Sequence, residues 1–156
     1  MNKMILKSLK KPLFWITLAA VSACAAALVF LLAIRAQSIS SQSIQLPSTS
    51  TLLSMEMEQI KADKSTGIVT VTDTTDMEAL LSALSRSRKT SRQSVNDSPN
   101  EDNYLIIRLK MAEGEKKLYL FSAGKHCCLE EPYVGIYMID KEANASIYAV
   151  YERSTR

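Results

Sequence analysis

The chain has 156 residues, of which 19 are basic and 16 acidic, and its formal net charge is +3. Five of the basic residues lie among the first 35 residues, so the other 121 residues carry 14 basic and 16 acidic side chains. This nearly neutral remainder lacks the basic surface on which nucleic-acid binders depend, and we exclude that class.

Residues 13–34 contain no charged side chain and follow a start with four lysines. As a helix that rises about 1.5 Å per residue, this run covers the roughly 30 Å hydrocarbon core of a bilayer. It predicts a single transmembrane helix in the lipid bilayer, after a basic cytoplasmic tail over 1–12. More positive charge precedes the helix than follows it at Arg35. We therefore expect the amino terminus inside and the carboxy-terminal domain outside the cytoplasmic membrane.

Two processing alternatives and one assembly alternative stay open for this segment. Small residues before Cys24 fit a lipoprotein that is lipidated at that cysteine, although ten more apolar residues follow it. Cleavage near Ala36 would suit a shorter apolar region than this one, so we favour an uncleaved signal anchor. Ala19, Ala23 and Ala27 recur every four residues and would let a second helix approach closely. A homodimer through this face competes with the simpler interpretation that alanine is abundant in the helix.

Residues 35–51 are rich in Ser, Thr and Gln and contain few large apolar residues. This composition cannot supply a core and predicts a linker. The folded domain is then expected over 52–156. Residues 43–46 alternate between polar and apolar side chains, which leaves open an edge strand at the end of the linker.

A hairpin and a helix are expected first in the domain. Alternation over 52–60 predicts a strand, residues 61–67 a turn, and the β-branched run at 68–72 a second strand. Asp73 can cap a helix after this run. Its apolar residues Met77, Leu80, Leu81 and Leu84 have the spacing of one helical face.

An antiparallel meander follows a polar stretch in the second half. Strands are predicted at 104–111, 117–121 and 126–130, with a short aromatic segment over 132–139. Asp140 can cap a final helix. The fold class is therefore α+β: a mostly antiparallel sheet of about five strands packed with two helices, behind the transmembrane helix.

Two motifs resemble a known family. Residues 90–100 (TSRQSVNDSPN) and residues 131–140 (EPYVGIYMID) look like a domain of unknown function found in small membrane-anchored or exported proteins of Gram-positive bacteria. The resemblance implies an extracytoplasmic α+β domain, and it supplies no catalytic residue, ligand or partner. Where that family usually has a pair of aromatic residues, this chain has Cys127 and Cys128.

The sequence offers a candidate interaction surface, which combines the basic run after the first soluble helix, the polar loop and the aromatic segment. Its residues are Arg86, Arg88, Lys89, Arg92, Asn96, Asp97, Tyr133 and Tyr137. Exposed arginine and tyrosine side chains suit an envelope protein, a peptide or an anionic wall polymer. A solvated loop and a half-buried core would explain the same residues without a ligand.

A small envelope enzyme, or a metal- or redox-dependent protein, is the rival interpretation, and it would use His126, Cys127 and Cys128. Neighbouring side chains on a strand point to opposite faces, so these three cannot converge on one ion, and a disulfide between the cysteines would be strained. The oxygen-rich loop at 96–103 lacks the regular spacing of a calcium loop. With one histidine and no catalytic motif, the sequence predicts a binding or regulatory module that is not catalytic and needs no cofactor or metal.

Overall fold

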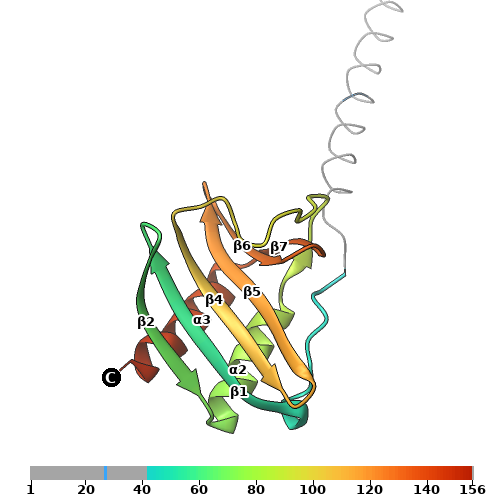
Figure 1. The fold of residues 1–156 in the computed structure, drawn as a ribbon. Coiled ribbons are helices and arrows are strands. Elements are labelled where there is room, and N and C mark those ends of the chain that lie inside the picture. The colour runs from blue at the N-terminus through green and yellow to red at the C-terminus, as the bar shows by residue number, and fades with distance from the viewer. Residues whose placement is uncertain (1–26, 28–41, 156) are drawn as a thin grey trace, which may run out of the picture. The chain divides into compact units, whose positions relative to one another are not determined.

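The computed structural model describes residue 27 and residues 42–155 of the chain (Figure 1). Within these residues, no helix is long and apolar enough to cross a membrane. The transmembrane helix predicted at 13–34 lies outside the described residues except for Ala27. The basic tail, Cys24 and the rest of the alanine face lie outside them too, so these predictions stay untested.

Seven strands form one antiparallel sheet in the order β2-β1-β4-β5-β6-β7-β3 (Figure 1). Their bounds are β1 (Leu52–Lys61), β2 (Lys64–Val71), β3 (Arg88–Lys89), β4 (Asn103–Met111), β5 (Gly114–Ala123), β6 (His126–Glu131) and β7 (Gly135–Ile139). The 3-10 helix η1 (Thr49–Thr51) precedes β1, and two longer helices, α2 (Thr74–Ser85) and α3 (Lys141–Ser154), lie on one face of the sheet. The predicted α+β class is therefore confirmed for this part of the chain.

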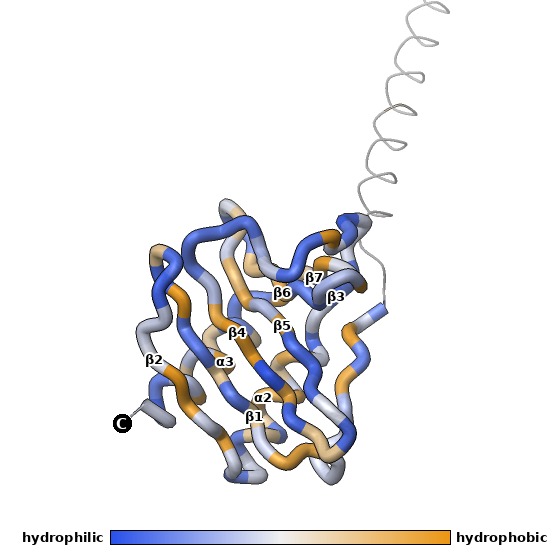
Figure 2. The backbone as a smooth tube through the Cα atoms, viewed as in Figure 1, coloured by the Kyte–Doolittle hydropathy of each residue, from blue (hydrophilic) through white to orange (hydrophobic). Residues whose placement is uncertain are grey.

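The main core lies between the two helices and the sheet face that they cover. Alternate residues of the central strands belong to this core. Hydrophobic and hydrophilic positions alternate along these strands in Figure 2. Asp73 and Asp140 cap the two helices by accepting hydrogen bonds from backbone N–H groups in the first turn, as predicted. The largest fully buried members of the core are Met55, Met57, Leu80, Leu84, Leu105, Ile107, Leu109, Leu118, Leu120, Leu129 and Ile147.

A second, smaller apolar cluster lies on the opposite face of the sheet. Tyr104 packs edge-on against Tyr119 there, with ring centroids 5.7 Å apart. The loop between β3 and β4 lies beside this face, because Val95 of the loop and Phe121 of β5 line one hollow. The buried members are Ile60, Ile106, Tyr119, Phe121, Cys128 and Ile136.

The sheet has seven strands where the sequence predicts about five. The added strands are β7, which lies inside the aromatic segment, and β3, which has only two residues and pairs with β7. A basic dipeptide carries no local strand signal, so β3 forms through tertiary pairing alone. The β1–β2 turn is also shorter than expected, since Ala62 and Asp63 both take positive φ (48° and 60°) and β2 starts at Lys64.

Part of the predicted linker packs on the domain. Ile44 is buried in the main core, and its neighbours are held by backbone contacts. Lys89 N donates to Gln42 O at 2.9 Å, and Lys116 Nζ donates to Gln45 O at 2.7 Å. The folded unit thus includes residues before 52, because Ile44 is buried in the main core and Leu46 packs against it.

Candidate functional site

The two sequence motifs meet in the structure, although the 30 residues 101–130 separate them in the chain. Ser94 Oγ donates to Glu130 Oε1 at 2.6 Å, and Glu130 is only 4% exposed. The same hydroxyl accepts from Tyr133 N at 3.2 Å. Tyr133 donates through its own hydroxyl to Asp97 Oδ1 at 2.7 Å. One serine therefore ties the loop after β3 to the connection between β6 and β7.

The start of this loop also lies along β7. Thr90 donates to Ile136 O through its backbone N–H (2.9 Å) and its hydroxyl (2.7 Å). Ile136 N donates back to Arg92 O at 3.2 Å. A Cβ atom at Gly135 would lie 3.1 Å from Lys89 Cε, near the end of a flexible side chain, and 3.8 Å from Arg92 O of the loop.

Tyr133 occupies an unusual backbone position for an aromatic residue. Val134 N donates to Glu131 O at 3.1 Å, so the chain turns over Pro132 and Tyr133. Proline fixes a negative φ at the second position, and Tyr133 has φ of 61° at the third, which makes a type II turn. Glycine or asparagine normally fills that third position, because other residues are strained there. Tyr133 is 64% exposed, and its hydrogen bond to Asp97 raises the pKa of the phenol.

Val95, Tyr133 and Val134 are three of the five large apolar side chains that are exposed among the described residues. Val95 is 71% exposed and Val134 46%. Arg92 precedes them in the loop, and Asp97 holds the tyrosine ring. We call these five residues the loop–hairpin surface. The described part of the chain gathers its exposed apolar side chains here more than anywhere else.

Six of the eight residues predicted for the interaction surface are exposed or half-buried and form no core contact or helix-joining ion pair. Arg88, Arg92, Asn96, Asp97 and Tyr133 are exposed, and Lys89 is half-buried against Gly135. Within residues 42–155, neither Arg88 nor Arg92 forms an ion pair or a hydrogen bond through its guanidinium. Their charges are therefore free for a partner.

Two of the predicted surface residues have other roles. Arg86 forms ion pairs with Asp140 at 2.9 Å and Glu142 at 3.1 Å, which join the end of α2 to the start of α3. Tyr137 is not on the surface as predicted, because alternate residues of β7 point inward and place it in the main core. Burial raises the pKa of its hydroxyl.

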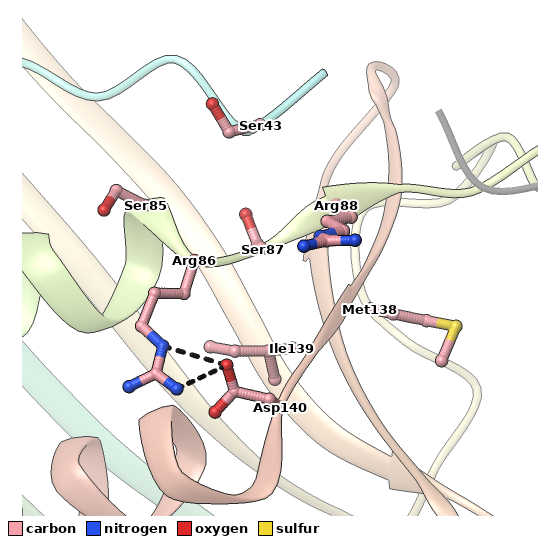
Figure 3. Close-up of a pocket in the computed structure, with 8 residues that line it drawn as sticks. All are labelled: Ser43, Ser85, Arg86, Ser87, Arg88, Met138, Ile139 and Asp140. Atoms are coloured by element: carbon pink, nitrogen blue, oxygen red, sulfur yellow. Dashed lines mark hydrogen bonds and ion pairs between the residues drawn. The ribbon is translucent and has the colours of Figure 1, made fainter. Parts of the chain in front are cut away.

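A hollow of about 550 Å³ lies where α2 ends and α3 begins, and Figure 3 shows its lining residues. Arg86 is already neutralised there by Asp140 (Figure 3). The hydroxyl of Ser87 is enclosed and has no hydrogen-bond partner. The free polar groups of this hollow therefore include the guanidinium of Arg88 and the hydroxyl of Ser87. Its lining residues are Ser43, Ser85, Arg86, Ser87, Arg88, Met138, Ile139 and Asp140.

His126, Cys127 and Cys128 do not form a joint site. Cys127 packs against the main core and Cys128 lies in the cluster on the opposite face, which confirms that the two thiols point apart. Both are free, and burial raises the pKa of Cys128, which disfavours its reactive thiolate. His126 is exposed. Within the described residues, including the loop at 96–103, no three His, Cys, Asp or Glu side chains are placed to hold a metal ion.

Sequence reasoning missed Ser94, Val95, Glu130 and Val134 as parts of the site. Ser94 and Val95 belong to the first motif, and Glu130 immediately precedes the second. These residues are brought together by the buried hydrogen bond from Ser94 to Glu130, which neither motif reveals on its own. The only available signal was that both motifs belong to the same family resemblance.

The arrangement of sheet and helices defines a small α+β domain that is known from a solved structure. That structure is the NMR structure of a protein from Ruminococcus gnavus, which matches with a TM-score of 0.53 at 20% sequence identity. The match covers 65% of this chain and 99% of the other, and it is a likeness of fold. No curated protein matches the chain.

Residues 40–138 match the family DUF5301, described as a domain of unknown function (DUF5300), and the chain belongs to this family. The match begins ahead of residue 52, in keeping with the packing of Ile44. It includes the loop after β3 and most of β7, and therefore both sides of the loop–hairpin surface.

Proposed function

We propose that this chain is a single-pass membrane protein, with its amino terminus inside, that presents the α+β domain outside the cytoplasmic membrane as a binding module without catalytic activity. The loop–hairpin surface makes the contact with an envelope component. The uncharged run at 13–34 and the lysines before it support the anchor and its orientation.

Tyr133 is the observation that carries the binding role. A glycine would fit its turn position without strain, and the tyrosine ring buries little surface of its own. The chain nevertheless holds the ring outward, through Ser94 at the backbone and Asp97 at the hydroxyl. Backbone strain at an exposed aromatic residue is typical of a functional position, and tyrosine is enriched at binding hot spots.

Protease treatment of intact cells tests the anchor and its orientation. The full chain carries a tag at each terminus, and the cells are fractionated after digestion. We expect loss of the carboxy-terminal tag and survival of the amino-terminal tag in the membrane fraction. A protected carboxy-terminal tag would overturn the orientation. A Cys24→Ala variant separates the lipoprotein alternative, since a transmembrane anchor keeps this variant in the membrane and a lipid anchor does not.

A photoreactive amino acid tests the contact surface in the same cells. One variant carries it at position 95. A control carries it at position 53, because Leu53 of β1 is exposed and lies beside the carboxy-terminal end of β4, whereas position 95 lies in the loop before β4. We expect adducts with a protein, polymer or lipid from position 95 and not from position 53. Tyr133→Gly should remove them. Equal adducts at both positions, or adducts unchanged by Tyr133→Gly, would show that the surface is not the contact.

A further inference from the structure

The loop after β3 and the sheet border a hollow of about 290 Å³. Val95 and Pro99 of the loop, with Phe121 and Ile136 of the sheet, supply its apolar lining. Most of its other lining residues carry amide, hydroxyl or charged groups. Arg92 and Val95 belong both to this lining and to the loop–hairpin surface, so the hollow adjoins that surface. A partner bound to the surface can therefore place a side chain in it.

Glu130 is the buried acidic residue of this hollow. It is 4% exposed, and Ser94 Oγ donates to its Oε1 atom. Among the described residues, nothing donates to Oε2 and no Lys or Arg side chain pairs with the carboxylate. Ser87 has the only enclosed side-chain polar atom without a partner in this part of the chain. Oε2 is therefore not enclosed, and because Glu130 lines the hollow, this oxygen is open to it.

A carboxylate in this position favours a cationic ligand. Burial removes water from its oxygens, and one neutral hydroxyl replaces only part of the lost hydration. Glu101 lines the same hollow and adds a second carboxylate, against the single guanidinium of Arg92. Glu101 and Arg92 are both exposed, so water and salt screen their charges more than the charge of the buried Glu130. The hollow therefore has an excess of negative charge, with its least screened part at Glu130.

We infer that this hollow receives a lysine side chain of a protein partner, with its ammonium group bound to Glu130 Oε2 and its stem against Phe121 and Ile136. Lysine combines a four-carbon apolar stem with a tip that donates three hydrogen bonds, which matches apolar walls and an open carboxylate oxygen. The exposed Val95 and Tyr133 beside the hollow suit the apolar surface of a protein. The inference rests on the binding role in the proposed function and names what the partner brings to the loop–hairpin surface.

Methyl NMR of the full chain in a non-ionic detergent tests the site. The isoleucine methyl groups are isotopically labelled; Ile136 reports on the hollow, and Ile44 of the main core is the internal control. The probe is N-acetyl-lysine methylamide. The matched control is N-acetyl-norleucine methylamide, because norleucine keeps the stem and lacks the ammonium group. We expect a saturable shift of the Ile136 signal with the lysine compound and none with the norleucine compound.

Exchange of the carboxyl group for an amide tests the contact with the ammonium group. Glu130→Gln keeps an acceptor for Ser94 and should weaken binding of the lysine compound about tenfold or more, because the ammonium group loses its charged partner. Glu115→Gln removes an exposed carboxyl group at the other end of β5 and should leave the affinity unchanged. Equal shifts with both compounds, or an affinity that Glu130→Gln leaves intact, would overturn the lysine site. The two compounds are compared on the parent chain, so this result does not depend on the folding of a variant.

Adducts in cells separate a failure of the lysine site from a failure of the proposed function. With the photoreactive amino acid at position 95, Glu130→Gln should remove a protein adduct. A protein adduct that persists in this variant, or adducts with lipid or polymer alone, would overturn the lysine site and keep the binding surface. Adducts no stronger at position 95 than at position 53, in a chain that binds the lysine compound, would support the lysine site and overturn the proposed contact surface.

Discussion

Ser87 and Ser94 are both buried, and their hydroxyl groups have opposite environments. Ser87 is 1% exposed and its hydroxyl has no hydrogen-bond partner, whereas Ser94 donates to the buried carboxylate of Glu130 and accepts from Tyr133 N. An unpaired buried hydroxyl costs free energy, and the loss of a partner for a buried charge costs more.

Ser87→Ala should raise the free energy of unfolding by about 0.5–1 kcal/mol, because it removes a polar group that gains nothing in the fold. Ser94→Ala should lower it by about 2–3 kcal/mol, because Glu130 loses its donor. Urea denaturation of the two variants beside the parent chain measures both changes. Similar losses in the two variants would show that the Ser87 hydroxyl has a partner after all.

Tyr133→Gly should leave the melting temperature unchanged or raise it, since glycine accepts positive φ at the third position of the turn. Tyr133→Ala should melt a few degrees lower than Tyr133→Gly, because alanine keeps the strain and lacks the hydrogen bond to Asp97. Thermal unfolding by circular dichroism checks the order of the two variants. A glycine variant that melts below the alanine variant would contradict the assigned turn.

The local sequence predicts some residues of the loop–hairpin surface, but it does not predict which residues contact one another. Asp97 and Tyr133 stand out in the two motifs as polar and aromatic residues next to turn formers. The burial of Glu130 depends on strand register and on a loop far away in sequence, which no local pattern specifies. The same register points Tyr137 into the core, whereas the next residue in the strand, Met138, is half-buried.

Strands β1 and β4 are joined by a strip of ion pairs on the sheet face away from the helices. Arg108 contacts Glu56 at 2.8 Å and Glu58 at 2.6 Å, and Lys110 contacts Glu56 at 2.9 Å. Hydrogen bonds from Lys110 and Arg108 hold the pKa of Glu56 below its ordinary value of 4.5, and a hydrogen bond from Arg108 does the same for Glu58.

These lowered carboxyl pKa values make the domain sensitive to acid. The stabilisation is fully present above the ordinary carboxyl pKa of 4.5 and is lost as the pH falls through the lowered values of the folded state. We therefore expect the midpoint of urea denaturation to fall on acidification below about pH 4.5. Arg108→Leu should flatten this pH profile and lower stability at pH 7. An unchanged profile in the variant would place the acid sensitivity elsewhere.

Among the elements, the two helices can be predicted from the sequence, whereas the strand β3 cannot. The helices are specified locally, since Asp73 and Asp140 precede apolar residues at helical spacing and both act as caps. In contrast, β3 owes its conformation to β7, its partner in the sheet. Tertiary pairing also extends β2 and β5 beyond their apolar runs, because the tight turns at 62–63 and 112–113 continue the ladder into polar residues.

For the whole domain, we expect stability to depend on the segment before β1. A chain that begins at residue 42 should fold, and one that begins at residue 52 should be less stable by about 2–4 kcal/mol, because it loses the burial of Ile44. Ile44→Ser in the longer chain should reproduce most of the loss, and Ser43→Ala should not. Urea denaturation of the four chains provides the comparison. Equal stability of the two lengths would mean that the segment adds nothing to the core.

The order of strands in the sheet has a consequence for synthesis. β1 lies between β2 and β4, and β4 does not begin until Asn103. Because translation proceeds from the amino terminus, the β1–β2 hairpin and α2 are made while Met55 and Met57 still lack their covering partners from β4 onward. At about 5–20 residues per second, the ribosome takes a few seconds to supply the stretch from the end of β2 to β4. A nascent chain caught in that interval carries an open strand edge, and it is the form of this protein most in need of a chaperone.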